Sequence, residues 1–130
     1  MKNDCSKPLS FLLLLLFIVF RSASLAQEPP AEQPPDNVAG KWTIYAKNTT
    51  NGKTSTKTVE ITQNGNQLGG HYKGTYESGG IEGTINVHHI VFRTKTRTVM
   101  TFRGRVEGNK MSGNYGFRGE HGEWEAERAN

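Results

Sequence analysis

Two stretches of the chain share one sequence pattern, G-N-x-Φ-x-G-x-Y, in which Φ is an apolar residue. The first runs from Gly65 to Tyr72 and the second from Gly108 to Tyr115. Glycine and asparagine tolerate the backbone angles of tight turns, and the residues that follow them suit a strand punctuated by glycine. Each stretch also follows a β-branched run, 58–62 in one case and 98–102 in the other. We therefore expect one hairpin design that is used twice.

The chain from Val38 onward has the same β character throughout. Short runs of alternating apolar and polar residues are separated by turns brief enough to force antiparallel neighbours. The pattern predicts eight strands, at 41–47, 55–62, 67–76, 81–87, 89–95, 98–106, 110–117 and 122–128. The predicted fold is all-β, an eight-stranded antiparallel up-and-down meander that forms a small closed or nearly closed barrel. An open rolled sheet would fit the same periodicity.

Alternation assigns one face of the predicted strands to the interior. Its members are Trp42, Ile44, Val59, Ile61, Leu68, Tyr72, Tyr76, Ile81, Ile85, Val87, Ile90, Phe92, Met100, Phe102, Val106, Met111, Tyr115, Phe117, Trp124 and Ala126. Several glycines fall on the same face, where they permit sharp strand curvature and leave room for aromatic rings. An eight-stranded barrel holds either a packed core or one small ligand.

The first part of the chain differs in composition from the rest. A short basic start, an apolar run and small residues up to Ala26 are typical of a secretory signal peptide. We therefore expect a signal peptide at 1–26, a proline-rich linker at 27–37 and the barrel domain at 38–130. The protein would be exported, periplasmic or secreted, after cleavage near Ala26, and an N-terminal membrane anchor is the alternative. The only cysteine, Cys5, would leave with the signal peptide.

The charge of the chain gives no argument for nucleic acid as a partner. The formal net charge is +4 at pH 7, and removal of three basic residues and one acidic residue with the signal reduces it to +2. Five basic residues alternate on two neighbouring predicted strands and would share one outer face: Arg93, Lys95, Arg97, Arg103 and Arg105. This face is either a solvated surface balanced by glutamates or a docking site for an anionic envelope component, such as a polysaccharide or lipid headgroup.

The predicted domain lacks the residue combinations that catalysis and metal binding require. The only aspartate beyond the signal, Asp36, lies in the predicted linker, and no cysteine remains after cleavage. His88 and His89 are adjacent, so on a strand they would point to opposite faces, while His71 and His121 are isolated. We therefore expect no enzyme, no metal site and no cofactor.

Short motifs at the two ends of the predicted domain are similar to motifs of known protein families. The domain opens with Gly40-Lys41-Trp42, a G-x-W start, and closes with Trp124-Glu125-Ala126-Glu127-Arg128, a W-x-A-x-R finish. Gly74-Thr75-Tyr76 also matches the G-T-Y of an avidin strand. The chain thus resembles the calycin-type barrels, lipocalins and avidins, and most of all small exported bacterial β-domains with the same end motifs. The resemblance implies a barrel whose first strand pairs with its last.

Three functional hypotheses follow. The leading one is an exported, non-enzymatic barrel that binds a small or apolar ligand or an envelope component. If a ligand enters the barrel, we expect it to be lined by Tyr72, Tyr76, Phe102, Tyr115 and Trp124. The alternative is an interaction module that docks an anionic partner on the basic outer face. A small enzyme of unfamiliar type is the third hypothesis.

Overall fold

A computed structural model describes residues 33–129, which form one β-domain. Its strands are β1 (Gly40–Asn48), β2 (Thr54–Asn64), β3 (Gln67–Lys73), β4 (Ser78–Asn86), β5 (His89–Lys95), β6 (Thr101–Glu107), β7 (Lys110–Phe117) and β8 (Glu120–Arg128). The predicted signal peptide and most of the predicted linker lie outside the described residues. Within the described part there is no helix with the length and hydrophobicity that a membrane crossing requires.

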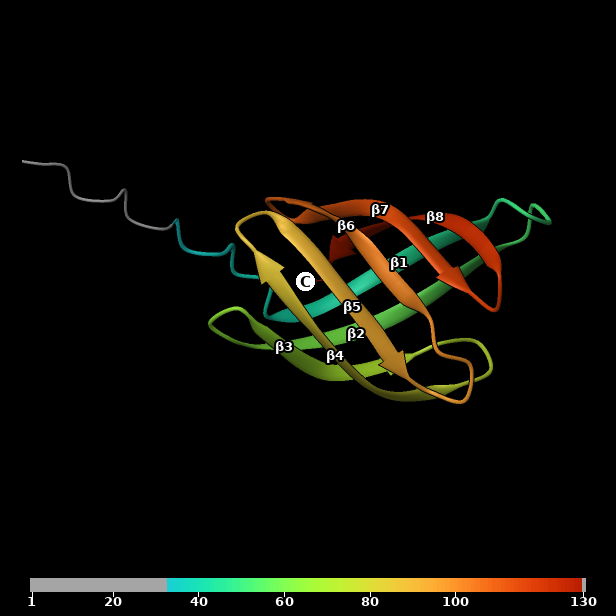
Figure 1. Ribbon diagram of the computed structural model, residues 1–130, viewed down its shortest axis with the longest axis horizontal. Helices are drawn as coiled ribbons and strands as arrows, with labels where there is room; N and C mark the ends of the chain where they lie inside the picture. Colours follow the sequence, from blue (N-terminus) through green and yellow to red (C-terminus); the bar gives the residue numbers. More distant parts are fainter. Residues whose placement is uncertain (1–32, 130) are drawn as a thin grey trace, which may run out of the picture. The chain divides into compact units, whose positions relative to one another are not determined.

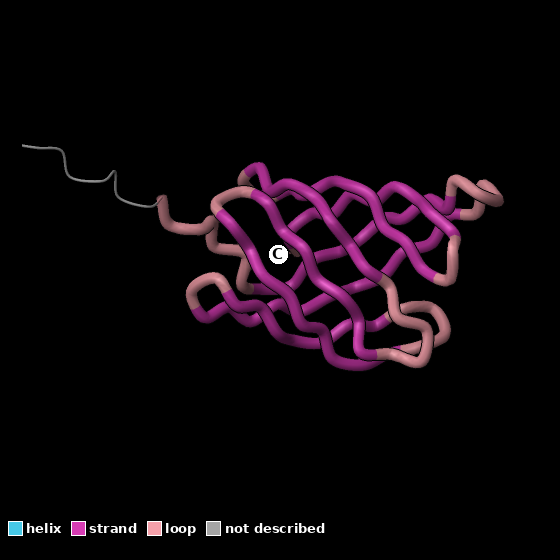
Figure 2. The backbone as a smooth tube through the Cα atoms, in the orientation of Figure 1, coloured by secondary structure: helices cyan, strands magenta, loops and turns pink. Residues whose placement is uncertain are grey.

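Each strand pairs antiparallel with the next one along the chain, and β1 also pairs antiparallel with β8. In this closing pair, Trp42 lies opposite Arg128 and Ala46 lies opposite Trp124. The eight strands therefore form a closed up-and-down barrel around a common interior (Figures 1 and 2). The predicted fold class is confirmed, and so is the pairing of the first strand with the last.

Two residues that alternation assigned to the interior, Tyr76 and Val87, lie in turns and not in strands. β3 ends at Lys73, three residues earlier than predicted, and the turn that follows leaves Tyr76 95% exposed. Val87 lies in the turn between β4 and β5, where it adopts a positive φ of 56°. Alternating faces require extended backbone, so the two-residue period fails where the chain turns. β5 and β7, by contrast, begin and end where the sequence predicts.

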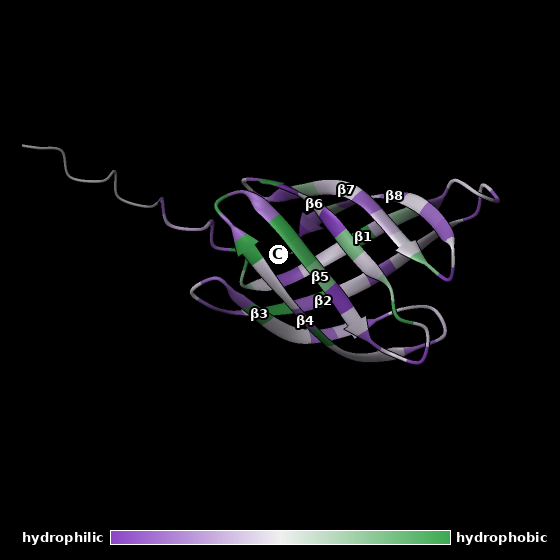
Figure 3. Ribbon diagram, in the orientation of Figure 1, coloured by the Kyte–Doolittle hydropathy of each residue, from purple (hydrophilic) through white to green (hydrophobic). Residues whose placement is uncertain are grey.

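Large side chains fill the interior by lying over glycines on neighbouring strands. Gly113 is opposite Trp124, and Gly122 is opposite Tyr115. A Cβ added at Gly104 would lie 2.8 Å from Trp124 Cζ2, and one added at Gly122 would lie 2.5 Å from Tyr115 Cε1. Apolar and polar residues mix along the strands, as a barrel with one buried and one wet face requires (Figure 3). The inward glycines thus leave the space that the aromatic rings occupy.

An aromatic cluster forms the middle of the packed core. The rings of Phe92 and Phe102 stack with their centroids 4.9 Å apart, and Trp124 meets both edge-on at 6.0 and 5.5 Å. Trp124 Nε1 donates to the carbonyl oxygens of Arg103 at 3.2 Å and Asn114 at 3.0 Å. Because the polar indole group is satisfied by backbone, the cluster can be buried without an unpaired donor.

The segment before β1 closes one end of the barrel. Val38 is fully buried there, and its carbonyl oxygen accepts a hydrogen bond from Trp42 Nε1 at 2.9 Å. The Arg128 guanidinium lies 4.5 Å from the centroid of the Trp42 ring and donates to the carbonyl oxygens of Ala39 and Asn37 at 2.7 and 2.9 Å. This stacking and these hydrogen bonds attach the last strand to the chain that enters the first.

Substitution of Gly104 by alanine tests the dependence of the core on inward glycines. The new Cβ would meet the Ser112 carbonyl oxygen and lie 2.8 Å from Trp124 Cζ2, so backbone or indole must move. We expect Gly104→Ala to lower the free energy of unfolding in urea by about 1–3 kcal/mol. Gly80→Ala is the control, because its Cβ would have no neighbour closer than 3.6 Å, and it should change stability by less than about 0.5 kcal/mol. Equal effects of the two substitutions would contradict this account.

Candidate ligand cavity

The end of the barrel opposite to residues 33–39 carries four turns, β1–β2, β3–β4, β5–β6 and β7–β8 (Figure 1). A partly open cavity of about 940 Å³ lies among these turns and the strand ends below them. It is lined by Asn48, Asn51, Lys53, Thr54, Ser55, Lys57, Tyr72, Thr75, Tyr76, Glu77, Arg97, Thr98, Met100, Tyr115, Phe117, Arg118 and Glu120. One end of the barrel is therefore closed by its own chain, and the other is hollow.

Hydrogen bonds join the turns of the rim in two pairs. Both carboxylate oxygens of Glu77, after β3, accept from the Thr98 N–H of the β5–β6 turn at 3.2 Å. Asn48 Nδ2, at the end of β1, donates to Glu120 Oε1 at the start of β8 at 3.2 Å. Among the side-chain hydrogen bonds of residues 33–129, none connects one pair of turns to the other.

Tyr72 and Tyr115 line the cavity, and other apolar side chains lie next to them. The Tyr72 hydroxyl donates to Met100 Sδ at 3.5 Å. The Tyr115 ring stacks between Phe102, at a centroid distance of 5.5 Å, and Phe117, at 6.1 Å. Tyr115 therefore links the packed aromatic cluster below to the cavity above, and Phe117 and Met100 give the cavity apolar surface.

Both tyrosine hydroxyls are protonated at neutral pH, and burial moves their pKa values further above it. Burial raises the pKa of Tyr72 to about 12, and the negative charge of Glu77 adds to the effect. Burial also raises the pKa of Tyr115, with a smaller contribution from Glu120. The Tyr115 phenol therefore remains a hydrogen-bond donor that a ligand in the cavity could use, whereas the Tyr72 phenol would first have to give up its weak hydrogen bond to Met100 Sδ.

Lys57 is a charged residue on the inner face of β2. It follows the same alternation as Val59 and Ile61, its side chain is 9% exposed, and it lines the cavity. Its Nζ donates to Ser55 Oγ at 2.8 Å. Burial lowers the pKa of Lys57, because removal of water disfavours the charged ammonium. Sequence reasoning missed this residue, although extension of the Val59–Ile61 alternation by two positions would have placed it inside.

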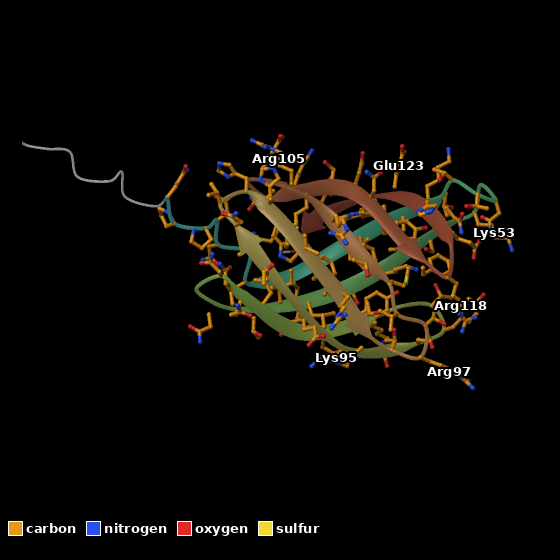
Figure 4. All side chains as sticks on the ribbon, in the orientation of Figure 1. Lys53, Lys95, Arg97, Arg105, Arg118 and Glu123 are labelled. Atoms are coloured by element: carbon orange, nitrogen blue, oxygen red, sulfur yellow. The ribbon has the colours of Figure 1, made fainter. Side chains whose placement is uncertain are left out.

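The charged groups around the cavity are mostly basic. The acidic residues are Glu77 and Glu120, and the basic residues are Lys53, Lys57, Arg97 and Arg118. Lys53, Arg97 and Arg118 extend from three different turns at the same end of the barrel (Figure 4). Both carboxylates already accept hydrogen bonds within the rim. The opening therefore presents a positive potential to an approaching ligand.

The structure separates the five aromatic residues predicted to line a ligand site. Tyr72 and Tyr115 lie together in the cavity wall. Tyr76 lines only the outer rim, where its side chain is 95% exposed. Phe102 and Trp124 belong to the packed core below, at 0% and 1% exposure. An inward residue lines the cavity only if its position along the barrel axis is near the hollow end. Alternation predicts which side chains point inward and does not predict this position.

Of the five basic residues predicted to share an outer face, the four on the paired strands β5 and β6 are exposed on that face, and the fifth lies in a turn. Arg93 Nη2 lies 2.8 Å from Glu82 Oε1, and Lys95 Nζ lies 3.7 Å from Glu82 Oε2. The hydrogen bond from Arg93 lowers the pKa of the Glu82 carboxyl. Arg97 lies in the β5–β6 turn at the cavity. The remaining two residues lie on β6: Arg103 and Arg105.

The histidines of the domain lie apart from the cavity lining. Within residues 33–129, no group of three or more His, Cys, Asp or Glu side chains is placed to hold a metal ion. His88 Nδ1 lies 2.8 Å from Asp36 Oδ2, so this contact connects the segment before β1 to the β4–β5 turn. Asp36 thus has a structural partner on the barrel, although it belongs to the predicted linker.

Comparison with solved structures finds proteins of similar form. No protein-family model matches the chain, and no curated protein matches it. The chain is similar to the Schistosoma mansoni fatty acid binding protein in complex with arachidonic acid, at 12% sequence identity and a TM-score of 0.48. The alignment covers 71% of this chain and 96% of that chain. The likeness to exported bacterial domains with G-x-W and W-x-A-x-R motifs stays an interpretation of the sequence.

Replacement of Lys57 by methionine should stabilise the protein. The lowered pKa of Lys57 means that the folded state holds its proton less well than the unfolded chain, whose lysine has a pKa of 10.5. The resulting penalty is complete below the folded pKa and disappears as the pH rises to 10.5. We expect Lys57→Met to raise the free energy of unfolding by about 1 kcal/mol or more at about pH 7, and by less at about pH 10.

Urea unfolding at the two pH values measures this difference, with Lys41→Met as the control. Lys41 is exposed on the outer face of β1, so its removal should change stability by less than about 0.5 kcal/mol at either pH. A loss of stability in Lys57→Met would show that the ammonium has a favourable partner in the fold, contrary to our account.

Proposed function

We propose that this protein is a non-enzymatic binding protein whose ligand, a small molecule with apolar surface, occupies the hollow end of the barrel. The observation that carries the proposal is the cavity of about 940 Å³. Small-molecule sites in proteins are typically clefts of roughly 300–1,000 Å³, and the volume of this cavity lies within that range. The export of the protein remains part of the proposal, on the strength of the N-terminal sequence pattern alone.

The composition of the cavity wall supports a ligand with both apolar and polar parts. Met100, Phe117 and the two tyrosine rings supply apolar contact surface. The hydroxyls of Tyr72 and Tyr115 remain protonated and can orient a ligand by hydrogen bonds. Hydrogen bonds within each pair of rim turns restrict the movement of these turns before a ligand arrives, which reduces the entropy lost on binding.

The packed core limits how deeply a ligand can enter. Phe92, Phe102 and Trp124 pack against one another below the cavity, and all three are buried. A ligand must therefore fit between this cluster and the rim, so the site suits one compact molecule and not a polymer threaded through the barrel. The alternative, docking of an anionic partner on the outer face, remains a prediction from the sequence.

Binding of a neutral fluorescent probe, N-phenylnaphthylamine, tests the proposal. Its fluorescence rises when it enters an apolar site, and we expect saturable binding to the full chain. Ser55→Trp would fill the cavity, because Ser55 lines it, and should weaken probe binding by about tenfold or more, equivalent to about 1.4 kcal/mol.

Thr56→Trp is the matched control for this experiment. Thr56 is the next residue of β2 and is exposed on the outer face, so the same bulky side chain lies outside the cavity. Probe binding by this variant should equal that of the wild type. Absence of saturable binding to the wild type, or equal binding by both variants, would contradict a ligand site inside the barrel.

A further inference from the structure

We propose that Lys57 is the anion-binding residue of the cavity, and that the ligand is a small organic acid whose acidic group contacts the Lys57 ammonium. This inference rests on the proposed function, because it assigns the ligand's chemical class to the same cavity. It is independent of the outer basic residues, since Lys57 lies on the inner face of β2 and lines the hollow end of the barrel.

Within the part of the chain that the structure describes, the Lys57 ammonium has no counter-charge. An ammonium group has three hydrogens to donate, and the structure gives Nζ one acceptor, Ser55 Oγ at 2.8 Å. The ion pairs of residues 33–129, defined by N–O distances up to 4.0 Å, all join other residues. A lysine that is 9% exposed is nearly always paired, because an isolated charge loses its hydration on burial.

The carboxylates that line the cavity already have other partners. Glu77 accepts the Thr98 N–H with both oxygens, and Glu120 accepts the Asn48 side-chain amide. These hydrogen bonds hold the rim turns together, so a movement of either carboxylate towards Lys57 would open the rim. Neither carboxylate in the described cavity lining is therefore free to pair with Lys57. A bound molecule would have to supply the negative charge.

The surroundings of Lys57 suit an acidic group with an organic body. The hydroxyls of Ser55, Tyr72 and Tyr115 are hydrogen-bond donors in the same cavity wall. Met100 and Phe117 can contact an aromatic or aliphatic body. The basic rim residues would attract an anion towards the opening: Lys53, Arg97 and Arg118. Carboxylates, phosphates and sulfonates share the required chemistry.

A matched pair of fluorescent probes tests the proposal in the full chain. Anilinonaphthalene sulfonate and N-phenylnaphthylamine have the same aromatic body, and only the first carries an anionic group. We expect the wild type to bind the sulfonate more tightly than the neutral probe. Lys57→Met should weaken sulfonate binding by about tenfold to a hundredfold, and should not weaken binding of the neutral probe, because methionine adds apolar surface to the cavity wall.

Two further variants separate this role from general effects. Lys41→Met removes the same charge from the outer face of β1 and should leave the binding of both probes unchanged. Lys57→Arg keeps a cation at the site and should retain most of the preference for the sulfonate. Naphthoate and naphthyl phosphate should displace the sulfonate probe from the wild type, and the stronger competitor identifies the acidic group.

The outcomes distinguish the two proposals. If the neutral probe binds in the cavity but Lys57→Met weakens both probes equally, or neither, the anion-binding role of Lys57 is wrong and the binding function stands. Failure of both naphthalene acids to compete would also overturn it. If neither probe binds the wild type, the proposed function fails together with this inference.

Discussion

The antiparallel pairing of β1 with β8 is the interaction on which the rest of the structure depends. Without this pairing the eight strands would be an open sheet with two unpaired edges and no enclosed space. Closure turns the alternation along each strand into an inside and an outside that all strands share. Arg128 reinforces the closure, because it lies opposite Trp42 in this pair and its guanidinium stacks on the Trp42 ring.

The interior that closure creates is divided along the inner face of each strand. On β2, Val59 and Ile61 point towards the packed end, whereas Ser55 and Lys57 point towards the hollow end. On β8, Trp124 belongs to the aromatic cluster, and Gly122 leaves room beside it for the Tyr115 ring. Apolar residues exclude water and pack tightly, while inward polar residues need partners or solvent. The cavity is therefore a consequence of residue type at successive inward positions.

Local signals in the sequence were sufficient to predict the eight strands and their antiparallel order, because alternation and turn chemistry act over a few residues. Closure of the barrel rested on the strand count and the end motifs, since an open rolled sheet has the same periodicity. They could not predict which aromatic residues lie at the cavity, since Tyr72 and Trp124 both point inward and differ only in depth. Depth follows from the register of all eight pairings together. Tyr76 was misplaced because the backbone turns after Lys73. Lys57 obeyed the alternation, but its charge suggested an exposed position.

The burial of Lys57 has no explanation in the stability of the barrel. A methionine or leucine at this inward position would continue the apolar series of β2 and avoid the desolvation of an ammonium group. Sequences depart from such local consistency mainly at functional sites, where an unfavourable group is compensated by what it binds. In the folded domain the compensation is incomplete, because Ser55 Oγ is a neutral acceptor. A bound acid would supply the missing negative charge. The Lys57 ammonium, which lowers the stability of the free protein, would then add to the stability of the complex.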